Sequence, residues 1–149
     1  MGSIKKGCPV AEKIYSKNVV PTRFIKGRDG GENRQMVWMT GKHMGGMEVD
    51  FVIEVYDETG KWPPGTHVHA FDECLVFFGW DEDINYLGAD MTLAMGKEAE
   101  VHRFSKPTVI AVPANMPHCP LGREKVYRKF GHFHLAGAGK YGAKYIDTV

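Results

Sequence analysis

The sequence of 149 residues lacks the features of several large classes of protein. It has no excess charge, because 19 Lys and Arg balance 18 Asp and Glu, and a net charge of +1 provides no strong field to attract nucleic acid or an anionic membrane. It contains no apolar run near the roughly 20 residues that a transmembrane helix needs. We therefore expect neither a nucleic-acid partner nor a membrane partner.

Cysteine is scarce, and its spacing argues against two further classes. The three residues, Cys8, Cys74 and Cys119, are odd in number and form no CxxC pair. The sequence thus supports neither a disulfide framework nor a structural zinc knuckle. The first 20 residues carry basic side chains but lack the apolar block and small-residue cleavage site of a signal peptide. We expect reduced thiols and a cytoplasmic location.

Leucine is also scarce, with 5 residues against 14 valines and 7 isoleucines. β-branched side chains favour strands, and 18 glycines with 8 prolines supply frequent turns. The pattern gives roughly eight or more short strands and no convincing helix of more than about 10 residues. It predicts an all-β domain, a closed barrel or a sandwich, over residues 34–135, with an N-terminal arm over 1–33 and an irregular tail over 136–149.

The segment 47–56 shows the alternation of a half-buried strand. One face carries apolar side chains, and the other is mostly acidic, with Val52 as its apolar exception. The alternation predicts that the apolar face packs into the core. The apolar face consists of Met47, Val49, Phe51, Ile53 and Val55, and further core residues are expected at Met36, Trp38, Met39 and Phe77.

The residues that suggest chemistry lie in the segment THVHAFDE, residues 66–73. His67 and His69 are separated by one residue, so on a strand both imidazoles project from one face, roughly 6.5 to 7 Å apart along the backbone. Glu73 completes an HxHxxxE pattern. Imidazole and carboxylate ligands suit one divalent transition metal, Fe, Mn, Ni, Co or Zn, with open coordination positions. The alternative is a pair of solvated histidines on the surface of a strand. The position of the two histidines just before the apolar run ECLVFF makes this alternative weaker.

Two segments resemble the motifs of the cupin superfamily. Pro63–Gly79 is similar to the first motif, although only Thr66 separates its glycine from its first histidine. Pro113–His118 matches the PxGxxH pattern of the second motif, with Asn115 in place of glycine. Asparagine tolerates a left-handed backbone better than other non-glycine residues, so we expect the turn to survive. The run from Leu87 to Pro120 also resembles single-domain cupins of anaerobic bacteria.

The resemblance implies a cupin-type β-barrel, a double-stranded β-helix or jelly roll, with a metal held by His67, His69, Glu73 and His118. It implies a metal-dependent enzyme acting on a small oxygen-rich organic substrate, of isomerase, decarboxylase, lyase, hydrolase or dioxygenase type, because the superfamily hosts many reactions. Glu73 is then either a permanent ligand or a catalytic base. The alternative is a metal-containing module that binds or senses a small molecule without turnover.

A second pair of histidines, His132 and His134, shares a strand face opposite Phe133 and Leu135. If the apolar pair fills the barrel, the histidines face outward or into a subunit contact. The alternative brings one of them into the pocket as a general acid or base.

Other reactive side chains are expected away from the site. His43 and His102 lie in polar contexts and are expected at the surface. Adjacent strand residues face opposite sides, so Cys119, beside His118, and Cys74 should point away from the metal.

The N-terminal arm carries more apolar surface than a small monomer would leave in water. Burial of the arm and of edge strands against a second copy predicts a homodimer. The apolar residues concerned are Ile14, Tyr15, Val19, Val20 and Phe24.

Overall fold

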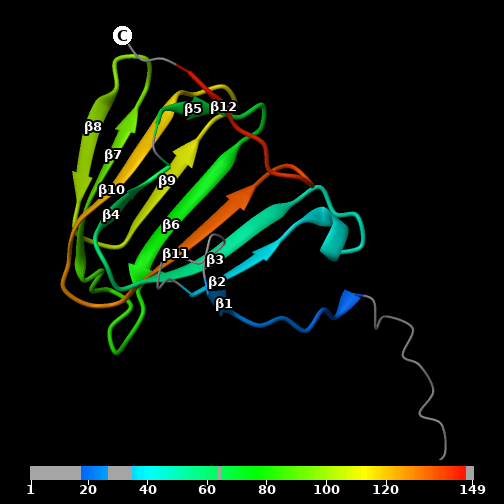
Figure 1. The fold of residues 1–149 in the computed structure, drawn as a ribbon, viewed down its shortest axis with the longest axis horizontal. Helices are drawn as coiled ribbons and strands as arrows, with labels where there is room; N and C mark the ends of the chain where they lie inside the picture. Colours follow the sequence, from blue (N-terminus) through cyan, green and yellow to red (C-terminus); the bar gives the residue numbers. More distant parts are fainter. Residues whose placement is uncertain (1–17, 27–34, 64, 147–149) are drawn as a thin grey trace, which may run out of the picture.

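The computed structural model describes residues 18–26, 35–63 and 65–146 (Figure 1). Its strands form two antiparallel sheets. The first sheet has the order β1 (Ile25–Lys26), β2 (Gln35–Met39), β3 (Asp50–Tyr56), β11 (Phe130–Ala136), β6 (Glu73–Gly79) and β9 (Thr108–Val112). The second has the order β12 (Lys144–Tyr145), β5 (His67–Val68), β10 (His118–Val126), β7 (Ala89–Met95) and β8 (Glu100–Phe104), with β4 (Gly60–Trp62) paired to β10.

The described residues are almost entirely strand and turn, which confirms the all-β prediction. A single turn of 3₁₀ helix, η2 (Gly41–His43), follows β2. The part of the chain that the structure describes includes no helix long and apolar enough to cross a membrane. The interleaved strand order, in which β11 lies between β3 and β6, is the arrangement of a jelly roll.

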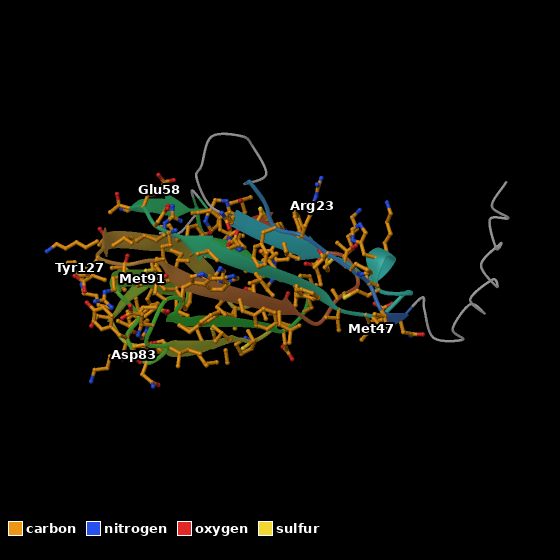
Figure 2. The ribbon with its side chains drawn as sticks, turned by 90° about the horizontal axis from the view of Figure 1, so that it is seen from below. Arg23, Met47, Glu58, Asp83, Met91 and Tyr127 are labelled. Carbon is orange, nitrogen blue, oxygen red and sulfur yellow. The ribbon has the colours of Figure 1, made fainter. Side chains whose placement is uncertain are left out.

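The core lies between the two sheets, where side chains fill the interior (Figure 2). It is built from large apolar residues contributed by both layers, and a stacked pair, Tyr56 and Phe130, lies within it with ring centroids 5.5 Å apart. Met36, Met39 and Phe77 are buried as expected, and Trp38 is partly buried. The other large members of the core are Leu75, Leu87, Met91, Leu93 and Leu121.

Strand β3 buries mainly the face that the sequence alternation predicts to be polar and exposed. Its inward face carries Asp50, Val52 and Glu54, whose exposed fractions are 0%, 8% and 4%. Phe51 is only partly buried, and Met47, which precedes the strand, is 58% exposed. The expected apolar face was therefore wrong except at Val55, which is buried, because the interior at this place is a polar site that satisfies the two carboxylates with hydrogen bonds.

Part of the N-terminal arm, including Ile14 and Tyr15, lies outside the described residues. Of the described part, Val19, Val20 and Phe24 are exposed, and the Phe24 ring contacts Trp80 with centroids 6.3 Å apart.

Candidate metal centre and adjoining cavity

Three histidines meet at one end of the barrel interior. β5 and β10 pair antiparallel with His67 opposite His118, and His69 follows two residues after His67. One nitrogen from each imidazole lies within 4.8 Å of the others, and each histidine is at most 3% exposed. The two motifs, about 50 residues apart in the sequence, are thus brought together by strand pairing.

Backbone carbonyls fix the tautomer of all three rings. The Nδ1 atoms of His67, His69 and His118 lie 3.3, 2.7 and 3.0 Å from the carbonyl oxygens of Gly65, Gly142 and Met116. A carbonyl oxygen only accepts, so each Nδ1 donates its proton. Each Nε2 is left with a lone pair, the form in which histidine binds a metal.

Glu73, the first residue of β6, faces these lone pairs. Its Oε2 lies 3.0 Å from Nε2 of His118 and 3.6 Å from Nε2 of His69. Within the described residues this oxygen is buried and makes no hydrogen bond of acceptable geometry. A carboxylate oxygen and imidazole lone pairs repel each other unless a cation lies between them. The donor set therefore fits a divalent transition metal.

The electrostatics of the site favour the same protonation state. Burial, together with His118, lowers the pKa of His67 to about 4, and burial likewise lowers the pKa of His69. Burial alone would raise the pKa of Glu73, but hydrogen bonds and charge from His118 and His134 in their protonated form outweigh burial and hold this pKa well below its usual value. Beside neutral rings, a bound cation would stabilise the carboxylate in the same way. Neutral imidazole and ionised carboxylate are the metal-binding forms of both groups.

The turn before His118 is hydrogen-bonded to the segment that contains His69 and Asp72. Asn115 has a φ of 65°, so it adopts the left-handed conformation expected of it. Its backbone N–H donates to the carbonyl of His69 at 2.7 Å, and the side chain of Asp72 accepts from the N–H of Ala114 at 2.9 Å. These bonds tie the second motif to the first.

The segment after β11 completes the site, and sequence reasoning missed it. β12 pairs with β5, placing Tyr145 opposite His67, and the C-terminal segment returns beside β5 (Figure 1). The Tyr141 hydroxyl lies 3.0 Å from Nε2 of His69, and its backbone N–H donates to Asp50 at 3.1 Å. The repeated tyrosine in KYGAKY was the only sequence signal for this contribution.

His132 and His134 lie inside the barrel, so the expectation that they face outward was wrong. They are 3% and 5% exposed, whereas Leu135 is 38% exposed. Nε2 of His134 lies 3.0 Å from Oε1 of Glu73. The reason is again that this part of the interior is polar, so the apolar pair Phe133 and Leu135 lies on the outer face.

Cys119 also lies inside, although strand alternation predicts that it points away. A shift in register between His118 and Leu121, together with a φ of 73° at Cys119, breaks the alternation. Burial raises the pKa of the Cys119 thiol, so it is not activated as a nucleophile. Cys74 is only partly buried, on the other face of β6, and His43 and His102 are exposed as expected.

Two small cavities lie near the candidate metal centre, and of these two only the smaller is lined by proposed ligands. One, of about 20 Å³, lies beside His67, Glu73, His118 and Cys119. The other, of about 50 Å³, extends between β2, β3 and β11. They share four lining residues, Trp62, His132, His134 and Tyr141, so the two cavities are neighbours.

Comparison with known proteins identifies the fold. No protein-family model matches the chain, and no curated protein matches it. Solved structures do: an oxalate decarboxylase variant from B. subtilis at 8% identity and a TM-score of 0.55, covering 76% of this chain and 28% of that one. Peruvianin-I, a cysteine peptidase from Thevetia peruviana latex, matches at 7% identity with a TM-score of 0.61, and the match covers 95% of this chain and 84% of that one. The polyketide cyclase RemF from Streptomyces resistomycificus matches at 10% identity with a TM-score of 0.56, and the match covers 93% of this chain and 87% of that one.

These similarities show that the chain has the cupin fold, as the two motifs predicted. The three neighbours are named as a decarboxylase, a peptidase and a cyclase, so the fold does not determine the reaction. The chain spans little more than a quarter of the length of the oxalate decarboxylase.

Proposed function

We propose that this protein is a metal-dependent enzyme acting on a small organic molecule that carries oxygen donors. The observation that supports the proposal is the convergence of Glu73 Oε2 on the Nε2 atoms of His69 and His118 at 3.6 and 3.0 Å, with no proton available from either ring. The lone pair of His69 accepts a bond from the Tyr141 hydroxyl, but the lone pair of His118 and the carboxylate oxygen, buried 3.0 Å apart, need a cation between them.

The residues that would hold the metal are His67, His69, His118 and Glu73. Bound there, a divalent ion would act as a Lewis acid toward an oxygen of the substrate. Nε2 of His134 lies 3.0 Å from the second oxygen of Glu73 but makes no hydrogen bond within the described residues, so a protonated His134 would pair with this carboxylate.

Elemental analysis of protein purified without a histidine tag tests the metal site. We expect about one divalent metal per chain in the parent and loss of stoichiometric metal in the double variant His67→Ala/His69→Ala. The matched control is His43→Ala/His102→Ala, which removes two exposed histidines and should keep the metal of the parent. Full metal content in the first double variant, with a native melting profile, would place the site elsewhere.

A screen of small acids, enols and phenols for turnover, under oxic and anoxic conditions, then tests for activity. Turnover that disappears with the metal supports an enzyme. Saturable binding of a screened molecule without any turnover by the metal-loaded protein would instead favour the alternative, a cupin that binds or senses its ligand.

A further inference from the structure

The first sheet carries polar side chains on its inner face and apolar side chains on its outer face. Its strands β2, β3, β11, β6 and β9 pair in regular register, so residues opposite each other share a face (Figure 1). The inner face holds Asp50, Glu54, Glu73, His132 and His134, all of them buried. Because successive residues of a strand alternate, the apolar residues of these strands are left for the outer face.

Two rows across the outer face contain no charged, amide or hydroxyl side chain, and we call these ten residues the outer patch. Its first row consists of Val37, Ile53, Phe133, Val76 and Val109, and its second row consists of Met39, Phe51, Leu135, Cys74 and Ala111. The rings of Phe51 and Phe133 pack together with centroids 6.0 Å apart. Side chains at the β2 end are buried, whereas Leu135 and Val109 are 38% and 66% exposed. The outer patch is therefore open to solvent toward β9.

The outer face of the second sheet has the opposite character. Around Thr92 it carries Asp90, Arg103, Glu124 and Lys125, which line a shallow surface groove. Charged side chains of both signs are the ordinary composition of a face in contact with water. The contrast between the two faces of one molecule indicates that the outer patch is built to meet protein.

The described part of the N-terminal arm extends the outer patch. Val20 lines a cavity of about 270 Å³ together with Met39 and Phe51, two members of the patch. Phe24 contacts Trp80, and all three of Val20, Phe24 and Trp80 are exposed. The arm thus adds an apolar rim beside the patch.

The area of the patch sets what an interface would require. With strands about 4.8 Å apart and a rise of about 3.4 Å per residue, two rows across five strands project roughly 300 Å². Exposed apolar patches of this size on a monomer often mark an interaction site. A dimer interface of standard size buries about 800 Å² per partner, so the arm and the residues around Trp80 have to contribute as well.

The lack of charge in the patch favours a second copy of this chain as its partner. In a two-fold dimer the same surface meets itself, so a charge near the axis faces a like charge. The outer patch has no charge that would repel its own copy. It also offers none with which to select a different, oppositely charged partner.

We propose that a second copy of this chain covers the outer patch. The two first sheets pack face to face, about 10 Å apart as in a β-sandwich, and the arms close the rim of the interface. This assignment gives the homodimer that the sequence predicts a specific surface. It depends neither on a bound metal nor on turnover.

Light scattering of the full chain over a dilution series tests the proposal. We expect a mass of twice the 16.7 kDa chain at high micromolar concentration and dissociation on dilution. A monomer throughout the series would overturn the proposal. Binding of that monomer to phosphatidylcholine vesicles would then assign the outer patch to a lipid surface.

Two charged variants locate the interface. Val109→Glu and Leu135→Glu each place a carboxylate at an exposed position of the patch, and each should raise the dissociation constant of the dimer at least about 10-fold. The matched control is Val101→Glu on β8, where the parent valine is 54% exposed and lies outside the patch. It should dimerise like the parent. If both patch variants are folded by their melting profiles and keep the dissociation constant of the parent, the interface lies elsewhere and the proposal is wrong.

A third variant tests the contribution of the arm. Phe24→Ser removes an exposed ring of the rim and should raise the dissociation constant about 5-fold or more. An unchanged constant would contradict the proposal, because the patch without the arm is smaller than a stable dimer needs.

Discussion

Tyr141 donates its hydroxyl to Nε2 of His69 across 3.0 Å, although the two residues are 72 positions apart. The Nδ1 atom of His69 is already committed to the carbonyl of Gly142, so Nε2 is the nitrogen that a metal would need. Burial and the charge of Glu73 raise the pKa of Tyr141, so its hydroxyl stays protonated and remains a donor. The hydroxyl and a metal ion therefore compete for one lone pair.

Removal of this hydroxyl should strengthen metal binding. A hydrogen bond of this kind contributes about 0.5–1.5 kcal/mol, so Tyr141→Phe should bind a divalent metal about 2- to 10-fold more tightly. Competition with a chromophoric chelator measures the affinity. Tyr127→Phe is the control, because Tyr127 is exposed and its hydroxyl bonds only to Asp90 among the described residues. A weaker affinity in Tyr141→Phe would identify the phenol oxygen as a ligand rather than a competitor.

Glu73→Gln separates two roles for the carboxylate. The change keeps the shape of the side chain and removes its charge, so as a ligand Glu73 predicts a fall in metal affinity of about 10-fold or more, together with activity. A base role predicts near-normal metal with turnover lowered by about 10². We expect the first outcome, because the oxygen lies between two imidazole lone pairs. Glu100→Gln on the exposed strand β8 is the control, and retention of both metal and turnover in Glu73→Gln would make Glu73 structural.

The two histidine motifs of the candidate site could be predicted because their information is local. His67 and His69 share a strand face by simple alternation, and the chain supplies a left-handed Asn115 where the second motif turns. The all-β class followed from β-branched residues and frequent turns for the same reason, since each strand is a short-range pattern.

The rest of the site depends on which face of a strand points inward, and alternation does not decide that. In β3 and β11 the polar face is the buried one, because Glu54 lies directly opposite His132 in the sheet and each satisfies the other. Hydrophobicity alone predicts the reverse. The contribution of Tyr141 could not be predicted for another reason. It depends on the pairing of the C-terminal strand β12 with β5, which is a contact between distant parts of the chain.

Asn115 offers a test of the turn that supports His69. Its φ of 65° penalises a side chain with a β-carbon and no local polar compensation, so Asn115→Ala should lower the free energy of unfolding by about 1 kcal/mol. Asn115→Gly removes the steric penalty and should lie within about 0.5 kcal/mol of the parent. Urea denaturation compares the three proteins. Equal stability of the alanine and glycine variants would mean that the left-handed backbone at this position costs nothing.

Acid should destabilise the metal-free protein through His67. In the folded state burial lowers the pKa of His67 from 6.5 to about 4, whereas in the unfolded chain it keeps its ordinary value. Between these two pH values the unfolded state binds the extra proton, so the free energy of unfolding falls as the pH is lowered through this window. A shift of this size corresponds to a loss on the order of 3 kcal/mol at pH 4, and the lowered pKa of His69 acts in the same direction.

Urea denaturation of chelator-treated protein at pH 7, 6, 5 and 4 measures this loss. His67→Asn removes the titrating group while keeping a side chain that can donate to the carbonyl of Gly65, so its stability should decline less steeply between pH 6.5 and 4 than that of the parent. His102→Asn, at an exposed position, should follow the parent curve. If the parent and His67→Asn lose stability in parallel across this window, the imidazole of His67 takes up its proton equally in both states, and the acid sensitivity arises from other groups.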